Sequence, residues 1–416
     1  MIERITMSDK NVRRAAVSAL RAWSKGHAYA DSLIDRHTSR NHLSREDRAL
    51  LNAIVLGVLR NRRLLDHWIS KLRKGKLDHE TRDILRVGLC QLLILGIPEH
   101  AAVNETVNCA RSAARGLVNA VMRRAAKTRS QMLADAEDLA PPVRYSHPDW
   151  LWKRWQKTWG KEKATALLQW DQEPAPVILR ENPLRPAPAP TTDLMPVPGQ
   201  DGFFESTGEF PHQLIEAGHY YVQDPSTALA PRLLAPRPGE RVLDACSAPG
   251  GKAALMAGLM ENTGTLVCTD SNEKRLPRLS ENFNRLGVTI AQAEVFDWSH
   301  PAPDKWRQHF DAILLDVPCS NTGVLRRRVD ARWRLQVDQL EALVKLQHTI
   351  LQNALACLKP DGRLVYSTCS IDPEENSGQM ERFLTAQPGW ELVESHQLVP
   401  FKDEVDGAYA VLLQAR

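Results

Sequence analysis

Two cysteines lie in short polar motifs whose residue types suit nucleophilic chemistry. Cys319 follows a proline in DVPCSNTGV, and Cys369 follows a threonine in YSTCSIDPEEN, 50 residues further along the chain. A cysteine in a polar loop beside a ligand pocket can act as a nucleophile when neighbouring groups lower its pKa from about 8.5. Four other cysteines lie in apolar runs and are interpreted as small buried hydrophobic residues: Cys90, Cys109, Cys268 and Cys357.

Carboxylates follow several of the apolar segments of the second half of the chain. Asp270, Asp297 and Asp316 each come directly after a segment that reads as a strand. A carboxylate after the second strand of such a series is placed to accept hydrogen bonds from ribose hydroxyls. One aspartate at a strand end is explained equally well as a helix cap, but several in register favour a ligand site.

The stretch RVLDACSAPGGK, residues 241–252, predicts the pocket that these side chains would line. An apolar strand runs into a glycine-rich turn, and Lys252 opens a helical run. Glycines let backbone N–H groups approach a ligand closely, and the helix dipole favours the anionic end of that ligand. Pro249 breaks the dinucleotide fingerprint G-x-G-x-x-G, so NAD is not the expected cofactor.

From Tyr220 onward the pattern alternates between strand and helix, which predicts a doubly wound parallel sheet. Ligands bind beyond the carboxyl ends of the strands in such sheets, and both cysteine motifs fall on loops at that edge. Asp372, Pro373 and Glu375 fit the N-cap, first-turn and capping-box positions of a helix that follows Cys369. The strands are expected at residues 242–245, 266–269, 312–315 and 363–367.

The first 140 residues read as helices with short connections, and an all-helical bundle is expected. Ser44 starts one helix, a second runs from about Asp78 to Gly96, and two more cover residues 101–115 and 116–127 with Gly116 between them. Residues 1–130 contain 25 Lys and Arg against 12 Asp and Glu, whereas the remainder contains 29 against 38. This asymmetry favours a nucleic-acid-facing helical module, with a solvated helical surface as the plain alternative.

Residues 141–218 read as a linker region. Four tryptophans lie within ten residues, at positions 150, 152, 155 and 159, and their spacing favours packing of a helix over stacking on bases. One strand-like run, PVILREN, is followed by a proline-rich spacer over residues 183–198, which we expect to lie extended without regular structure.

Composition excludes several classes of protein. The content of 43% hydrophobic and 25% charged residues is that of a globular chain, and the longest apolar-rich run, Val87 to Ile97, is too short to span a bilayer. Seven scattered cysteines without a C-x-x-C pair indicate a reducing compartment and argue against a zinc site. The N-terminus has no apolar signal segment, so we expect a cytoplasmic protein. We also expect a monomer that needs neither a membrane nor a metal ion.

The paired cysteine motifs carry a family resemblance that covers nearly the whole chain. The sequence resembles the Fmu/Sun family of RNA cytosine-5 methyltransferases, to which bacterial small-subunit rRNA methyltransferase B belongs. DACSAPGGK, LLDVPCS-TGV and VYSTCS-PEEN look like its cofactor motif and its two cysteine motifs. AAVNETVN and GLVNAVMRR resemble its NusB-like N-terminal domain. The resemblance implies a NusB-like RNA-binding bundle over residues 1–140, a linker and RNA-contacting subdomain over 141–218, and a Rossmann-like class I methyltransferase domain over 219–416.

The resemblance also implies a role for individual residues. S-adenosyl-L-methionine would be the cofactor and RNA, 16S rRNA in particular, the partner. Cys369 would be the nucleophile, Cys319 the second cysteine that resolves the adduct, and Asp316 would lie between cofactor and base. The loop residues implied to wrap the methionine end of the cofactor are Cys246, Ser247, Ala248, Pro249, Gly250, Gly251 and Lys252. Asp270 would hold the ribose and Asp297 the adenine side.

The basic segment after Cys319 is a candidate for RNA binding. Its arginines are offset only by Asp330 and lie near the place where a target base would enter, so phosphate contacts are expected from Arg326, Arg327, Arg328, Arg332 and Arg334. A solvated helix start is the alternative.

Three departures from the family pattern concern the substrate. Asn321 stands where the family usually has glycine, RRRVDARWR replaces a form with fewer basic residues, and the region 183–221 is abbreviated. Three alternatives stay open. They are a tRNA or other RNA substrate, a DNA cytosine-5 methyltransferase that uses the cysteine of the proline-cysteine motif, and a non-catalytic RNA-binding assembly factor.

Overall fold

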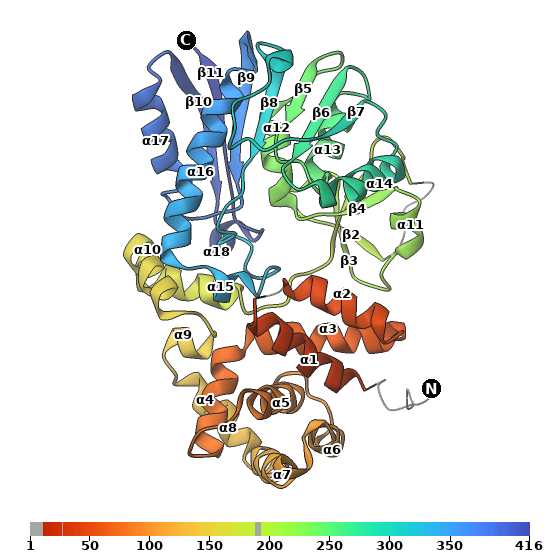
Figure 1. The fold of residues 1–416 in the computed structure, drawn as a ribbon, viewed down its shortest axis with the longest axis vertical. Helices are drawn as coiled ribbons and strands as arrows, with labels where there is room; N and C mark the ends of the chain where they lie inside the picture. Colours follow the sequence, from red (N-terminus) through yellow and green to blue (C-terminus); the bar gives the residue numbers. More distant parts are fainter. Residues whose placement is uncertain (1–10, 27, 188–192) are drawn as a thin grey trace, which may run out of the picture. The chain divides into compact units, whose positions relative to one another are not determined.

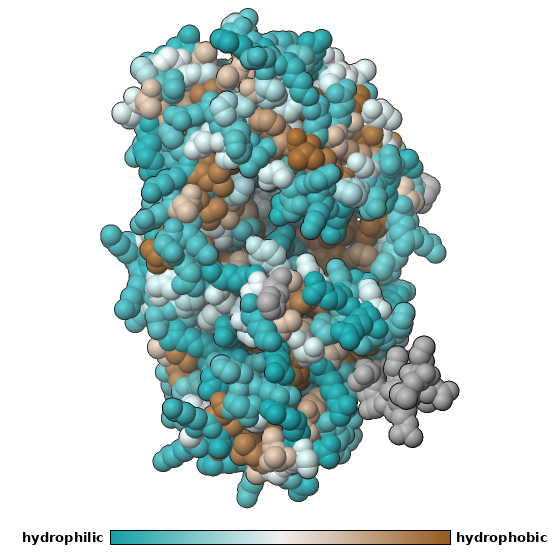
Figure 2. Space-filling model, viewed as in Figure 1, coloured by the Kyte–Doolittle hydropathy of each residue, from teal (hydrophilic) through white to brown (hydrophobic). Residues whose placement is uncertain are grey.

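A computed structural model describes residues 11–26, 28–187 and 193–416. The chain divides into two compact units. The helical unit comprises the residues up to Glu173 together with Arg328–Arg334, and the sheet unit comprises Pro174–Arg327 together with Leu335–Arg416. Residues 328–334 thus leave the sheet unit and return to it within a short segment. In the view of Figure 2, polar side chains cover most of the surface and apolar ones form small separate patches.

The helical unit is a bundle, as predicted (Figure 1). Asn11 caps its first helix, and Ser44 caps the third by accepting a hydrogen bond from the backbone N–H of Asp47 at 3.1 Å. The helices are α1 Val12–Ser24, α2 Ala30–Arg40, α3 Arg45–Arg60, α4 Arg62–Leu72, α5 His79–Leu89, α6 Glu99–Cys109, α7 Ser112–Lys127, α8 Arg129–Glu137, α9 Pro141–Arg144, α10 Asp149–Trp170 and α15 Ala331–Arg334. A π-helical turn, Cys90–Ile94, extends α5.

One predicted helix boundary in this unit is wrong. The break between α6 and α7 lies at Ala110 and Arg111, both extended, and not at Gly116, which lies inside α7. A Cβ at Gly116 would meet no neighbouring atom within 4 Å, so close packing does not explain the glycine at this position. The tryptophans of α10 do pack, because Trp155 is fully buried and its ring lies 6.0 Å from that of His147.

The sheet unit begins with a small antiparallel sheet in the order β2-β3-β1-β4. Its strands are β1 Ile178–Glu181, β2 Leu194–Pro196, β3 Phe203–Ser206 and β4 Tyr220–Val222, and α11 His212–Glu216 lies between the last two. The strand β1 was predicted from PVILREN. The expectation that residues 183–198 lack regular structure is wrong for β2, which pairs with β3, and residues 188–192 lie outside the described part of the chain.

The main sheet has seven strands in the order β10-β11-β9-β8-β5-β6-β7. The five strands β9-β8-β5-β6-β7 pair in parallel, as expected, but β11 is antiparallel to both β9 and β10, so the sheet is mixed. The strands are β5 Arg241–Asp244, β6 Thr265–Asp270, β7 Ala291–Val295, β8 Phe310–Asp316, β9 Leu358–Thr368, β10 Trp390–Leu398 and β11 Ala408–Ala415.

Helices cover both faces of this sheet, which is why its central strands are continuous apolar runs (Figure 1). Val242 packs with α12 Leu229–Leu234, α13 Gly251–Leu259 and α14 Leu276–Leu286 on one face. The next residue, Leu243, packs with α16 Val337–Leu355 and α17 Ser377–Ala386 on the other. A short helix, α18 Pro400–Asp403, precedes β11. Because β5 to β8 are parallel, their carboxyl ends meet at one edge.

Candidate active site

The three predicted carboxylates lie at the carboxyl edge of the main sheet: Asp270 ends β6, Asp316 ends β8, and Asp297 follows β7. Asp244, which ends β5 at the same edge, was not predicted as a site residue. Asp270 is almost completely buried, and its Oδ1 accepts a hydrogen bond from the backbone N–H of Asn272 at 2.8 Å. Asp297 accepts the backbone N–H of Ser299 at 2.9 Å, and this hydrogen bond holds the pKa of Asp297 below its usual value.

The loop from Cys246 to Lys252 connects β5 to α13, as the glycine motif predicts. The backbone N–H of Ser247 donates to the carbonyl oxygen of Thr269 at 2.8 Å, which fixes the loop against β6. Gly250 has a φ of +98°, and a Cβ there would lie 2.6 Å from Leu279, so glycine is required for both conformation and space. Gly251 then begins α13.

Asp244 is a buried carboxylate at this edge, 1% exposed, and among the described residues neither of its oxygens has a hydrogen-bond partner. Burial, together with the nearby charge of Asp316, raises the pKa of Asp244 to about 7. An unpartnered carboxylate of this kind fits a cationic ligand group. S-adenosylmethionine has such groups in its ammonium and sulfonium, and its ribose hydroxyls suit Asp270, so the residues present fit this cofactor.

Lys252 and Asp316 form an ion pair that the sequence did not reveal. The Nζ of Lys252 lies 2.5 Å from Oδ2 of Asp316, and Ser367 donates a hydrogen bond to Oδ1 of Asp316 at 2.9 Å. Burial acts to lower the pKa of Lys252, but the attraction of Asp316 outweighs it and the net pKa is raised. Lys252 was expected only to wrap the cofactor, and its ion pair with Asp316 was not predicted.

The two cysteines meet, as their loops predicted. The Sγ atoms of Cys319 and Cys369 are 3.1 Å apart, although the residues are 50 positions apart in sequence. The hydrogen bond with Cys369, followed by burial, raises the pKa of the Cys319 thiol well above its usual value. Cys319 is therefore a protonated thiol at neutral pH.

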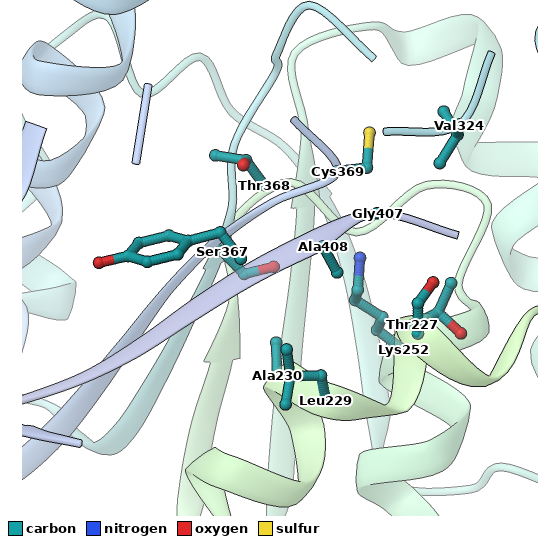
Figure 3. Close-up of a pocket in the computed structure, with 12 residues that line it drawn as sticks. Thr227, Leu229, Ala230, Lys252, Val324, Ser367, Thr368, Cys369, Gly407 and Ala408 are labelled. Carbon is teal, nitrogen blue, oxygen red and sulfur yellow. The ribbon is translucent and has the colours of Figure 1, made fainter. Parts of the chain in front are cut away.

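A pocket lies directly beside Cys369 (Figure 3). The side chain of Lys252 points from α13 toward Cys369, and Val324, Gly407 and Thr227 also line the pocket. Ser226 and Thr227 come from a 3-10 turn, Pro225–Ala228, that sequence analysis did not single out. The run QDPSTA, a proline after a potential capping aspartate, was the available signal for this turn.

Buried polar contacts join the two loops that carry the cysteines. The helix-capping role predicted for Asp372 and Glu375 is therefore wrong. Asp372 and Glu375 do not cap a helix, because α17 begins only at Ser377, after Asn376. Asp372 instead accepts the hydroxyl of Thr322 at 2.7 Å. Glu375 accepts the backbone N–H of Ser320 at 2.9 Å and also binds the Ser320 hydroxyl.

The arginine segment differs most from its prediction. Of the five arginines only Arg328 is exposed. Arg327 forms ion pairs with Asp224 and Asp406, both at 2.7 Å, and Arg326 is buried. Arg332 is completely buried in the helical unit and donates to the carbonyl oxygen of Asp171 at 2.9 Å, and Arg334 donates to that of Ala28. Four of the five side chains are therefore engaged within the protein, and Arg328 is the exposed one.

The fold, the glycine loop and the strand-end carboxylates define the class as an S-adenosylmethionine-dependent methyltransferase joined to a NusB-like helical domain. Comparison with known families agrees. The model of the family described as 16S rRNA methyltransferase RsmB/F matches residues 231–412, the NusB family matches 10–127, and the ferredoxin-like domain of RsmF/B-like methyltransferases matches 147–194.

Relatives that match nearly the whole chain show the family to which it belongs. Ribosomal RNA small subunit methyltransferase B of Vibrio cholerae is 37% identical, with 97% of each chain covered. The probable enzyme of the same name from Synechocystis is 34% identical, over 91% of this chain and 90% of the relative. The chain belongs to this family of methyltransferases. A methyltransferase homolog from Pyrococcus horikoshii shares the fold over 66% of this chain and 98% of its own, with a TM-score of 0.57 and 26% identity.

Two further properties concern possible partners. Across the described part of the chain, every helix is either too short or too polar to cross a membrane. The same residues contain no cluster of three or more His, Cys, Asp or Glu side chains arranged to hold a metal ion.

Proposed function

We propose that this protein methylates carbon 5 of a cytosine in small-subunit ribosomal RNA, 16S rRNA in bacteria, through a covalent adduct with Cys369. The observation that carries the proposal is the pair of thiols 3.1 Å apart beside the Lys252–Asp316 ion pair. A reaction that needs one nucleophilic thiol and a second thiol beside it accounts for both cysteines. The relatives named above support the choice of RNA.

The chemistry explains why a thiol is needed. Carbon 5 of cytosine is too weak a nucleophile to take a methyl group unaided. The Cys369 thiolate adds to ring carbon 6, which turns carbons 5 and 4 into an enamine-like system and lets carbon 5 accept the methyl group. A base then removes the proton from carbon 5, the bond between sulfur and carbon 6 breaks, and the Cys369 thiolate is regenerated.

S-adenosylmethionine supplies the methyl group when it is bound. Asp270 would bind its ribose hydroxyls, Asp297 the adenine side, and the loop from Cys246 to Lys252 the methionine end. Asp244 would face a cationic group, which would balance the buried carboxylate.

Lys252 and Asp316 are suited to act at the base. Addition at carbon 6 places negative charge on the ring, and a proton held at ring nitrogen 3 offsets it. The ammonium and carboxylate, 2.5 Å apart, form a pair that can hold a proton at that atom. Ser367 fixes the carboxylate from the other side, so the pair is already oriented.

Cys319 acts in the second half of the reaction. Its raised pKa keeps it protonated while Cys369 attacks, so the two thiols do not compete as nucleophiles. Its Sγ then lies close to the sulfur–carbon bond that must break. Among the arginines of the segment after Cys319, Arg328 is left to contact an RNA phosphate, because its side chain is exposed.

Mapping of 5-methylcytosine tests the proposal directly. Bisulfite sequencing or mass spectrometry of 16S rRNA is compared between cells with the gene, cells without it, and cells without it that express Cys369→Ala. We expect one cytosine to lose its methyl group in the last two. Loss of methylation in tRNA alone would reassign the substrate, and unchanged methylation in every RNA would refute the proposal.

A further inference from the structure

Asn321 joins the two cysteines through its side chain. Its Nδ2 donates a hydrogen bond to the carbonyl oxygen of Cys319 at 2.9 Å, and its Oδ1 accepts one from the Sγ of Cys369 at 3.3 Å. One amide therefore contacts the backbone of the first cysteine and the thiol of the second.

The orientation of this amide follows from its partners. The carbonyl oxygen of Cys319 can only accept, so the amide nitrogen must face it and the amide oxygen must face Cys369. The backbone is fixed as well, because the carbonyl oxygen of Asn321 accepts the N–H of Val324 at 3.1 Å. Gly323 donates to the carbonyl oxygen of Cys369 at 3.0 Å, which ties the same loop to the second cysteine.

The position of the amide oxygen has a consequence for the thiol pair. A thiol has one hydrogen, and among the described residues the Sγ of Cys369 has two hydrogen-bond partners, Oδ1 of Asn321 and Sγ of Cys319. An amide oxygen is a better acceptor than a sulfur, so the hydrogen of Cys369 points at Asn321. The lone pairs of Cys369 are then turned toward Cys319, whose own S–H becomes the donor between the two sulfurs.

We propose that Asn321 is a positioning residue that orders the hydrogens of the two thiols: Cys369 donates its S–H to Asn321 and accepts the S–H of Cys319. This inference rests on the proposed function, in which Cys369 attacks and Cys319 keeps its proton. It predicts that Asn321 restrains the reactivity of Cys369 before any RNA is bound.

The substitution Asn321→Gly removes the amide without straining the loop. Asn321 has a φ of +60°, a conformation that glycine adopts freely. A matched control is Asn262→Gly. Asn262 has a φ of +56° and also makes two side-chain hydrogen bonds, to Gly287 and Thr289, but none to either cysteine.

The test measures alkylation of the full-length protein by iodoacetamide, without RNA, with the modified cysteines identified by peptide mass spectrometry. We expect Cys369 to react faster than Cys319 in the parent and in Asn262→Gly. In Asn321→Gly the S–H of Cys369 loses its acceptor, so the ratio of the two rates should rise about fivefold, the value of one hydrogen bond. An unchanged or lower ratio in Asn321→Gly would overturn the inference. An equal rise in Asn262→Gly would overturn it too, because it would indicate general loosening.

A second measurement separates this inference from the proposed function. Each protein is incubated with S-adenosylmethionine and RNA that contains 5-fluorocytosine, whose fluorine cannot leave as a proton does, and covalent complexes are counted on denaturing gels. We expect faster complex formation by Asn321→Gly than by the parent, because the S–H of Cys369 is no longer held by the amide oxygen. A parent that forms no complex contradicts the proposed function, whereas the alkylation ratio still decides the role of Asn321.

Discussion

The carboxylate of Glu375 binds Ser320 through both of its oxygens. Oε1 accepts the backbone N–H of Ser320 at 2.9 Å and Oε2 binds the hydroxyl, across 55 residues of sequence. Gln347 on α16 donates to the same carboxylate at 2.8 Å and to the carbonyl oxygen of Pro318 at 2.9 Å. The residues on either side of Cys319 are thereby attached to the loop that follows Cys369.

The first prediction follows from this attachment. Glu375→Ala leaves the N–H of Ser320 and one N–H of the Gln347 amide without an acceptor in a buried site, while the bond from Gln347 to Pro318 remains. Each unsatisfied group costs about 1–3 kcal/mol. We expect a lower melting temperature of the sheet unit and a loss of methyl transfer of at least about tenfold. Glu381→Ala, at an exposed position on α17, is the control and should change neither. Equal melting temperatures for the two variants would contradict the assigned role.

The second prediction concerns Asp270 and the cofactor. Asp270→Ala removes the acceptor proposed for the ribose hydroxyls, and binding of S-adenosylmethionine should weaken by about one to two orders of magnitude, because those hydroxyls lose a partner. Titration calorimetry measures the dissociation constant. Asp361→Ala, at an exposed position, should bind as the parent does. Unchanged affinity for Asp270→Ala would remove this residue from the cofactor site.

Local sequence patterns predicted those parts of the structure that local forces determine. Val242 and Leu243 lie in an apolar run that fits a strand covered on both faces, and the following aspartate marks the strand end. The strand β10 was not predicted, because nearly all of its side chains are exposed and its sequence WELVESHQL has no continuous apolar face.

The wrong predictions concern residues whose positions are determined by contacts with residues far away in the sequence. Asp372 and Glu375 match a helix-capping pattern, but their partners Thr322 and Ser320 come from a loop about fifty residues earlier, and these contacts determine their position. Arg332 reads as a surface charge, yet it is buried because backbone carbonyl oxygens of the helical unit accept its hydrogen bonds. Sequence spacing placed both cysteines at the same edge, but the 3.1 Å separation required the fold.

The third prediction is a pH dependence of stability due to Asp244. Its pKa of about 7 in the folded protein lies above the value of 3.8 for an unperturbed aspartate. The stability that it contributes is therefore fully present below about pH 4 and is lost as the pH rises through 7, by at most about 4 kcal/mol. Asp244→Asn cannot ionise, so its melting temperature relative to the parent should rise between pH 5 and pH 8. A constant difference across this range would show that Asp244 does not titrate there.

The fourth prediction concerns the buried arginine of the helical unit. Arg332→Met removes the donor to the carbonyl oxygen of Asp171, while Val329 and Trp333 in the same segment keep their contacts with the apolar core of that unit. An unpaired buried carbonyl costs about 1–3 kcal/mol, and the melting temperature of the helical unit should fall by several degrees. Arg328→Met, at the exposed position, should leave it unchanged. If Arg328→Met lowered the melting temperature more than Arg332→Met, the assignment of Arg332 as buried and Arg328 as exposed would be wrong.

The fifth prediction separates the roles of the two cysteines. Cys369→Ala cannot form the bond to carbon 6, so it should lose nearly all methyl transfer while it still binds S-adenosylmethionine, because this thiol is proposed to contact the base. Cys319→Ala should still attack and still methylate, but it should fail to release the product. A covalent protein–RNA complex should therefore accumulate in Cys319→Ala alone, as a slowly migrating band on a denaturing gel that depends on S-adenosylmethionine.

The double variant Cys319→Ala, Cys369→Ala is the control for this band and should form none, because no thiol remains to attack the ring. A mechanism of the DNA cytosine-5 type would reverse the assignment, with the complex formed through Cys319 when Cys369 is removed. Purely structural roles for the two thiols would give no covalent species from either single variant. The order of attack and release proposed for the pair, whose sulfurs lie 3.1 Å apart, therefore depends on which single variant retains the RNA.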